Sequence, residues 1–223
     1  MKLTKFGHSC IRLEKDSGVL VFDPGTESDV EAALSGATAI LITHEHADHF
    51  DAERVLPFLE SNEKLEIYAP PSVAASIHES ASEQVSERVR VPHVGEPFEV
   101  AGFNIQVFGG QHALIHPLLP VVANYGYLVD GDVFHPGDSF TVPETVAKSQ
   151  LKVLLVPFQA PWSKTSEVID FVISVRPARA LPIHDAMVND SGRGVIEKHL
   201  KMISSRFGTS YEALENGVTL DLA

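Results

Sequence analysis

Three histidines and one aspartate, all of types that bind divalent metal ions, fall within one short segment, HEHADH: His44, His46, Asp48 and His49. Imidazole nitrogens and carboxylate oxygens suit zinc, manganese and iron. Grouping them directly after the apolar run TAILIT (38–43) is costly unless a cation or polar partners satisfy them. A histidine-rich surface loop without function is the alternative interpretation. The cost of burying unpaired imidazoles and carboxylates favours a metal site.

The spacing within this segment predicts two pairs of ligands. In an extended turn His44 and His46 point the same way, because side chains of extended backbone alternate with a period of two. Asp48 and His49 follow as the next helix begins, so that each pair can serve a different ion. The helical zinc motif H-E-x-x-H does not fit, because the residue four positions after His44 is Asp48 and not histidine.

Three further β-like runs each end in a histidine or an aspartate. The run NIQVFGG (104–110) leads to His112, DVFHPG (132–137) leads to Asp138, and ARALPI (178–183) leads to His184. In α/β sheets, ligands collect at strand ends, where loops converge. Five histidines and two aspartates then share one cleft, which is too many for one closed tetrahedral zinc site and about right for two metal ions.

The elements that must position these residues follow a pattern that occurs twice. Short β-like runs at 3–6, 11–14 and 19–22 precede alternating helices (29–36, 51–61, 71–82) and strands (38–43, 65–69). The β-rich stretch 88–136 likewise precedes helices at 141–149, 165–175 and 194–208 and strands at 152–158 and 179–184. This repetition predicts an α/β fold with two mixed β-sheets stacked face to face and helices outside, as one domain over 1–223.

Composition excludes several classes of function. The net charge is -13, from 17 basic and 30 acidic residues, so nucleic acid is not an expected partner. Cys10 is the single cysteine, which rules out a disulfide framework within the chain and a four-sulfur zinc site. The first 18 residues contain no apolar core of a secretion signal, and no run is long enough to cross a bilayer. A cytoplasmic protein with no membrane partner is the expectation.

The motifs together resemble those of the metallo-β-lactamase superfamily. THEHADHF matches its H-x-H-x-D-H signature, and GGQH, HPGDS and LPIH match its later ligand motifs in order. KFGHSCIRLE and FDPG, with HPGDS and LPIHD, more narrowly resemble the ascorbate-6-phosphate lactonase-like branch. The chain lacks the C-terminal helical extension of the glyoxalase II relatives and the added domains of the RNA-processing relatives.

The resemblance implies a four-layer αβ/βα sandwich with the site between the sheet edges. One metal ion would take His44, His46 and His112, the other would take Asp48, His49 and His184, and Asp138 would bridge both. Two divalent ions, zinc first with manganese or iron as alternatives, give a metal-bound hydroxide at neutral pH. The predicted activity is hydrolysis of a small lactone, ester or phosphoester, with Asp48 orienting the hydroxide or accepting its proton.

Two other functions stay open. One is a metal-dependent metabolite-binding or sensor module without turnover, against which the intact ligand set argues. The other is a nuclease or phosphodiesterase, which the negative charge disfavours. Some relatives associate, so a homo-oligomer is possible, but no interface is apparent from the sequence.

Two candidates lie near the start of the chain. His8, in the turn GHSC, is the second catalytic candidate, because its place in the branch motif suggests substrate contact or proton transfer. The alternative is a turn histidine bonded to backbone. Cys10 is expected to be a packed strand residue, because no activating base is evident. Asp23 is expected to be structural, bonding turn amides or orienting a ligand histidine.

The remaining candidates come later in the chain. His116 is the alternative to His112 as a ligand, and His135 is expected to support the site without binding metal. Trp162 either stacks on substrate or packs. Lys164, with the helix N-terminus at 163–166, suggests an anionic group on the substrate. His78, His93 and His199 have no expected role.

Overall fold

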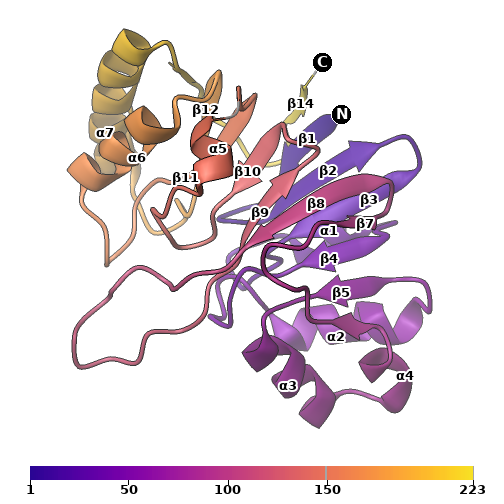
Figure 1. Ribbon diagram of the computed structural model, residues 1–223. Helices are drawn as coiled ribbons and strands as arrows, with labels where there is room; N and C mark the ends of the chain where they lie inside the picture. The colour runs from indigo at the N-terminus through magenta and orange to yellow at the C-terminus, as the bar shows by residue number, and fades with distance from the viewer. Residues whose placement is uncertain (149, 223) are drawn as a thin grey trace.

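Two seven-stranded β-sheets form the middle of the molecule (Figure 1). The computed structural model describes residues 1–148 and 150–222. The first sheet has the order β14-β1-β2-β3-β4-β5-β6 and the second has the order β13-β12-β11-β10-β9-β8-β7. Strands of the first sheet are β1 (Lys2–Lys5), β2 (Ile11–Lys15), β3 (Gly18–Phe22), β4 (Ala39–Leu41), β5 (Glu66–Tyr68), β6 (Val89–Arg90) and β14 (Thr219–Asp221). Strands of the second are β7 (Phe98–Val100), β8 (Phe103–Phe108), β9 (Gly126–Val129), β10 (Val133–His135), β11 (Val153–Pro157), β12 (Arg179–Ile183) and β13 (Ser210–Tyr211).

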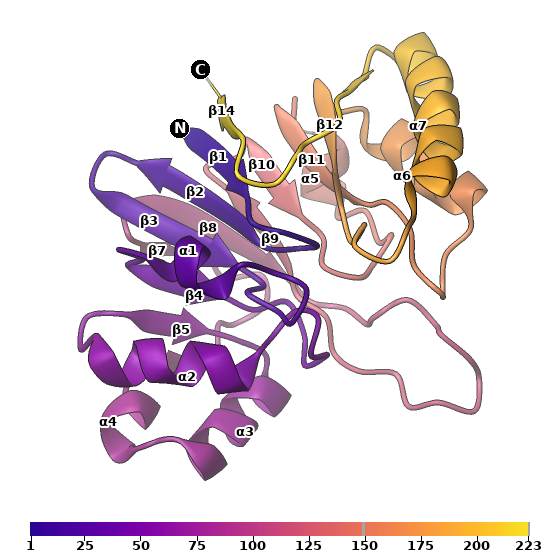
Figure 2. The ribbon, with the colours of Figure 1, turned by 180° about the vertical axis from the view of Figure 1, so that it is seen from behind.

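Both sheets are mixed, which matches the predicted hairpins followed by α/β alternation. In the first sheet β1, β2 and β3 pair antiparallel, whereas β3, β4, β5 and β6 pair parallel. In the second sheet β7 to β10 pair antiparallel, and β10 to β13 pair parallel. Strand β14 pairs antiparallel with β1, so the end of the described chain lies beside its beginning (Figure 2).

Helices cover the outer face of each sheet. Against the first sheet lie α1 (Val30–Leu34), α2 (Ala52–Ser61), α3 (Pro71–Ser80) and α4 (Glu83–Ser86). Against the second lie α5 (Glu144–Lys148), α6 (Thr165–Val175) and α7 (Asp190–Ser204), which the short turn η1 (Ser205–Phe207) follows. Side-chain caps start several of them; the Asp51 carboxylate, for example, accepts a hydrogen bond from the Arg54 amide at the start of α2.

Alternation along the strands produces three apolar cores and therefore four layers. In β3, Leu20 and Phe22 face the core between the sheets, whereas Val21 faces the helices. In β11, Leu155 faces the core between the sheets and Leu154 faces α6 and α7. The predicted αβ/βα sandwich is confirmed.

Several boundaries differ from the prediction. The segment 88–94 contributes only the two-residue strand β6, and Pro92, which has no N–H to donate, lies just beyond it. Helix α2, by contrast, agrees with the predicted 51–61 to within one residue despite Pro57, and its Val55 and Leu59 are buried against the first sheet. Helix α7 begins at Asp190, four residues before the predicted start, because Asn189 caps it. Helix α5 begins at Glu144, and the predicted last residue, Ser149, lies outside the described residues.

Among the residues described, the longest helix, α7, has 15 residues, and none is long and apolar enough to span a bilayer.

Candidate metal centre

Four loops bring the predicted ligands together at one edge of the two sheets. Asp138, in the loop after β10, lies at the centre of the group. Its Oδ2 is 3.0 Å from Nε2 of His184, which follows β12, and 3.3 Å from Nε2 of His112, which follows β8. Its Oδ1 is 3.1 Å from Nε2 of His49, in the loop after β4. Three segments that are distant in sequence thus converge on one carboxylate.

The nitrogen and oxygen atoms around Asp138 fall into two main groups, each with atoms within 4.8 Å of one another. One group contains His44, His46 and His112. The other contains Asp48, His49 and His184, with His8 as an additional member. Asp138 also lies within the same limit of His44 and His49, so it touches both groups. The two groups have the same members as the two ligand sets that the resemblance implies, with His8 in addition, and their binding of metal stays a prediction.

Hydrogen bonds on the second ring nitrogen orient two of the histidines. Nδ1–H of His184 donates to the carbonyl oxygen of Gln159 at 2.8 Å, and Nδ1–H of His112 donates to that of Ala113 at 2.6 Å. Because a carbonyl oxygen only accepts, the proton of each neutral ring is on Nδ1 and the lone pair is on Nε2. Neither Nε2 atom has a hydrogen-bond partner, although both are buried.

Asp23 orients the histidines of the first cluster from a fully buried position. Its Oδ1 accepts the amide of Thr43 at 2.8 Å, and its Oδ2 accepts the Thr43 hydroxyl at 2.7 Å and Nδ1–H of His49 at 2.7 Å. The oxygen of that hydroxyl is then free to accept Nδ1–H of His44, 3.0 Å away. Asp23 therefore has the orienting role that was expected of it.

The electrostatics of the group favour positive charge beside its buried carboxylates. Burial opposes ionisation of Asp138, but His49 and His184 outweigh it and hold the pKa of that carboxyl well below its usual range. Burial lowers the pKa of His49 and His184, but the Asp138 carboxylate outweighs it and raises both, that of His49 well above its usual value. The buried carboxylates thus favour positive charge beside them. A divalent cation would supply that charge.

The orphaned atoms fit a metal ion. Nε2 of His49, His112 and His184 and Oδ1 of Asp138 are all buried without a hydrogen-bond partner, although they approach one another closely. Buried polar atoms without partners are rare and destabilising. Imidazole nitrogen with carboxylate oxygen is the donor set expected of zinc, manganese or iron.

Two glycines allow the ligand loops to approach other backbone closely. A Cβ on Gly25 would lie 1.9 Å from the carbonyl oxygen of Asp48, which no side chain tolerates. Gly137 has a φ of +61°, and a Cβ there would lie 2.3 Å from Oδ1 of Asn124, the atom that accepts the Asp138 amide. The FDPG and HPGD sequences thus owe their glycines to the geometry of the site.

Three other candidate residues, His116, His135 and Cys10, lie outside the two ligand groups. His116, the alternative to His112, is exposed, and its Nδ1 accepts the amide of Leu118, so the structure does not bring it into the cluster. His135 is fully buried, with Nε2–H donating to the carbonyl of Ser9 at 3.1 Å, outside the ligand groups. Cys10 is buried, and burial raises the pKa of its thiol, so it is unsuited to nucleophilic attack.

Trp162 lies over the cluster. Its ring centroid is 5.4 Å from that of His112, 5.8 Å from that of His184 and 5.3 Å from that of Phe140. The half-buried indole therefore packs against two predicted ligands, as the packing interpretation expects, and stacking on a substrate stays a prediction. Phe140 was not singled out, because nothing in the sequence distinguishes it from a core phenylalanine.

The charge expected at the start of α6 is largely neutralised. The Lys164 ammonium lies 3.5 Å from the Glu167 carboxylate, and its side chain is 79% exposed. The Lys164 amide donates to the same carboxylate at 2.9 Å. His78, His93 and His199 are exposed, as expected of residues without a role.

The segment 113–122 forms a loop that extends away from the body of the molecule in both views (Figures 1 and 2). The amide of His112 donates to the carbonyl of Val122 at 3.0 Å, and an antiparallel bridge joins Gln111 to Ala123, which together close its base. The amide of Ala113 donates to the carbonyl of Asp138 at 2.8 Å. Apolar side chains at its far end are exposed, with Leu118 at 87%.

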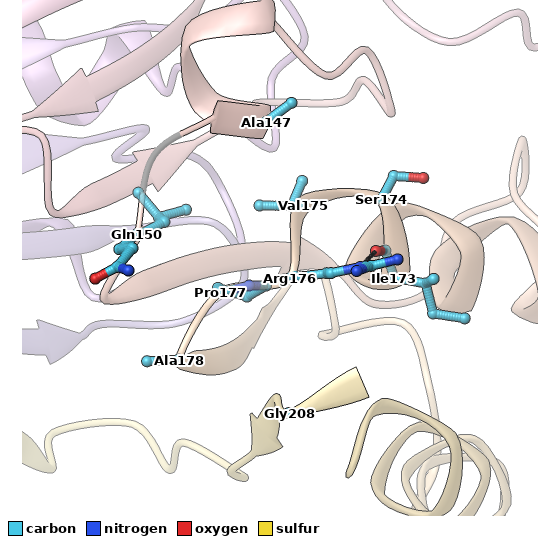
Figure 3. Close-up of a pocket in the computed structure, with 10 residues that line it drawn as sticks. Ala147, Gln150, Ile173, Ser174, Val175, Arg176, Pro177, Ala178 and Gly208 are labelled. Atoms are coloured by element: carbon cyan, nitrogen blue, oxygen red, sulfur yellow. Dashed lines mark hydrogen bonds between the residues drawn. The ribbon is translucent and has the colours of Figure 1, made fainter. Parts of the chain in front are cut away.

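Cavities of about 490 Å³ adjoin the cluster on two sides, one lined by His112 and Phe140 and the other by His8 and Arg193. A third cavity of about 690 Å³ lies between the ends of α5 and α6 and Gly208 (Figure 3). It shares no lining residue with the cluster, and the described residues that line it include no histidine, cysteine or carboxylate. Its described lining therefore offers no side chain of the types found in the cluster.

Three partners of the site were not foreseen: Thr43, Asn124 and the carbonyl of Gln159. Thr43 directly precedes His44, so a polar residue at the end of an otherwise apolar strand was a usable signal. Asn124 and Gln159 carry no signal, because they act on Asp138 and His184 through the tertiary fold.

Comparison with known proteins agrees with this geometry. The family model described as Beta-lactamase superfamily domain matches residues 2–184, a range that contains all seven predicted ligands. Protein Rv0786c of Mycobacterium tuberculosis is 41% identical over 98% of this chain and 100% of its own length. A UPF0173 metal-dependent hydrolase of Xanthobacter autotrophicus is 26% identical over 70% of this chain and 71% of its own length.

The solved structure of Igni18, a metallo hydrolase from Ignicoccus hospitalis, is similar in fold, with a TM-score of 0.71 and 19% identity over 99% of this chain and 98% of that one. Taken with the family model and the named relatives, the orphaned ligand atoms around Asp138 lead to one conclusion: the chain belongs to the metallo-β-lactamase superfamily and is a metal-dependent hydrolase.

Proposed function

We propose that this hydrolase uses two divalent transition-metal ions to cleave a small ester, lactone or phosphoester. The observation that carries the proposal is the position of Asp138. Its two oxygens approach nitrogen atoms of both ligand groups, within 3.3 Å of His112 on one side and 3.1 Å of His49 on the other. One carboxylate that serves both groups favours a bridged pair of ions over a single closed site.

The division of ligands follows from the same contacts. His44, His46 and His112 would hold one ion, whereas Asp48, His49 and His184 would hold the other. Zinc is the first expectation, with manganese or iron as alternatives. Such a pair supplies Lewis acidity toward a carbonyl or phosphoryl oxygen and makes water a nucleophile at neutral pH.

Asp48 is the group best placed to handle a proton. Its side chain is 27% exposed, whereas those of His49 and His184 are almost fully buried, so water and substrate reach the second group through Asp48. Burial alone would raise the pKa of Asp48, but the hydrogen bond from His8 and the charge of His49 outweigh it and lower that pKa. The ionised carboxylate can accept a hydrogen bond from an attacking water and orient it.

The surroundings favour a small substrate. A cavity of about 490 Å³ is lined by His112 and Phe140, and Trp162 packs against both of these rings. Within the proposed class, the motifs shared with the ascorbate-6-phosphate lactonase-like branch favour a lactone. An anionic group has less support, because Lys164 already pairs with Glu167. The net charge of -13 favours a small molecule over nucleic acid, and we propose a cytoplasmic location.

The test combines metal content with turnover. Purified native protein should contain near two equivalents of transition metal, and it should hydrolyse at least one member of a panel of lactones, phosphodiesters and thioesters. His46→Ala and Asp138→Ala should lose metal and hydrolysis together. His78→Ala, which removes an exposed histidine of α3, is the matched control and should keep both.

Full turnover in a metal-stripped sample would refute the proposal. A metal-loaded chain that cleaves no member of the panel but binds one tightly would favour the sensor interpretation instead.

A further inference from the structure

By distance alone, His8 would be a ligand of the same metal ion as Asp48, His49 and His184. It is 1% exposed, in the turn between β1 and β2. Its Nε2 is 3.2 Å from Oδ2 of Asp48, and its ring centroid is 4.2 Å from that of His184. One ring nitrogen of His8 falls within 4.8 Å of ligand atoms of Asp48, His49 and His184.

The hydrogen bond on its other nitrogen runs in the opposite direction from those of the ligand histidines. The amide N–H of Ala186 donates to Nδ1 of His8 at 3.2 Å. A backbone amide can only donate, so Nδ1 carries the lone pair, and the proton of the neutral ring is on Nε2. In His112 and His184, by contrast, Nδ1 faces a carbonyl oxygen and Nε2 is the free atom.

We infer that His8 is a positioning residue, whose Nε2–H donates to Oδ2 of Asp48, and that it does not bind metal. The inference rests on the proposed function in so far as Asp48 serves the second ion. Oδ2 is the Asp48 oxygen that lies 3.5 Å from Nε2 of His184 and 3.9 Å from Nε2 of His49. A carboxylate oxygen has two lone pairs, so one can take the His8 proton while the other faces the ion.

His8 also connects the loops after β4 and β12, which carry the residues of the second group. The amide of His184 donates to the backbone carbonyl of His8 at 3.2 Å, and that of Ala186 donates to its ring. His8 is thus fixed to the loop after β12 and reaches across to Asp48 in the loop after β4. Its backbone adopts a φ of +44°, which a non-glycine residue rarely does unless surrounding contacts hold it there.

The decisive measurement is the position of the proton on His8. In protein labelled with ¹⁵N and loaded with ¹¹³Cd²⁺, we expect a one-bond proton coupling at Nε2 of His8 and no cadmium coupling at either of its nitrogens. Nε2 of His49, His112 and His184 should couple to cadmium, and the His8→Gln spectrum assigns the His8 signals. Cadmium coupling at His8, or a proton found on its Nδ1, would overturn the inference.

Metal affinity gives a second readout. His8→Leu removes the donor, and it should bind as many equivalents of cadmium as the native chain, with one of them about 10–100-fold weaker, the loss typical of a partner that orients a ligand. His8→Gln keeps an N–H donor at a similar distance and should restore most of that affinity. His78→Leu, at an exposed histidine of α3, should change nothing.

Loss of a whole equivalent in His8→Leu, or unchanged affinity, would also refute the inference. The spectrum of the native chain decides the matter even if the leucine variant does not fold. A native chain that takes up no cadmium would instead overturn the proposed function, and the one-bond coupling in its metal-free spectrum would still decide the tautomer of His8.

Discussion

Replacing Asp23 with asparagine should damage both the fold and the metal centre, although the two side chains have the same shape. The carboxylate is fully buried and accepts three hydrogen bonds, from the amide and hydroxyl of Thr43 and from Nδ1–H of His49. If the asparagine oxygen keeps the Thr43 amide, its NH₂ group must face the other two donors. To avoid a clash of protons, His49 must move its own proton to Nε2, the atom that is to bind metal.

The size of the effect follows from the bonds that are lost. A hydrogen bond to a charged group contributes about 1.5–3 kcal/mol, so two of them correspond to about 3–6 kcal/mol. The new NH₂ group can donate to the Thr43 oxygen, which favours the lower end. We therefore expect Asp23→Asn to lower the free energy of unfolding by about 3 kcal/mol. Metal affinity should fall about 10–100-fold, because the orientation of His49 is lost.

Urea unfolding of metal-free protein, followed by circular dichroism, measures the first quantity, and competition with a chromophoric chelator measures the second. Asp170→Asn, which makes the same chemical change on the exposed face of α6, is the control and should alter neither. If Asp23→Asn unfolded within 0.5 kcal/mol of the native chain, which is the usual range for surface substitutions, and bound metal as tightly, the orienting role of Asp23 would be wrong.

Four further outcomes are expected. Gly25→Ala should destabilise the protein by several kcal/mol in thermal unfolding, about as much as severe overpacking does. The reason is that the new Cβ would lie 1.9 Å from the Asp48 carbonyl oxygen, and an unchanged melting temperature would contradict this close approach. The Cys10 thiol, whose pKa burial raises, should resist a disulfide reagent at pH 8 in the native chain and react at once in urea; fast native labelling would show that the strand is open. Chelation should lower the melting temperature, since an ion present at 100 times its Kd stabilises the folded state by about 2.7 kcal/mol; an unchanged Tm would argue against metal binding. Burial and the Glu66 carboxylate raise the pKa of Tyr68 to about 12, so the stability linked to its neutral form is present below pH 10 and is lost as the pH rises toward 12. Between pH 9 and 11, Tyr68→Phe should therefore lose less free energy of unfolding than the native chain in urea. Equal losses in the two proteins would exclude that linkage.

The sequence predicted the layers and the ligand cluster because both are expressed in local patterns. Short continuous apolar runs, as in VLVF and KVLLVPF, mark strands buried on both faces, and each ligand motif directly follows a β-like run. The short elements α4, β6 and β13 could not be predicted reliably, since two to four residues carry too little pattern. Strand β14 forms through its pairing with β1, at the opposite end of the chain.

Within the site, the sequence showed which residues meet but not how their protons are arranged. The tautomers of His8 and His184 depend on the amide of Ala186 and the carbonyl of Gln159, which the fold brings into place. Residue type alone therefore could not separate a histidine that binds metal from one that donates to a ligand. His112 was favoured over His116 through the GGQH motif, and the structure brings only His112 into the ligand groups.

The loop at 113–122 is closed at its base, next to His112, and open to solvent at its tip. Changes in the length or sequence of the loop near Leu118 would thus leave the predicted ligands in position, while altering which molecules can reach them. The preference for one substrate over another can therefore change through replacement of this one loop, while the residues of the metal centre stay the same.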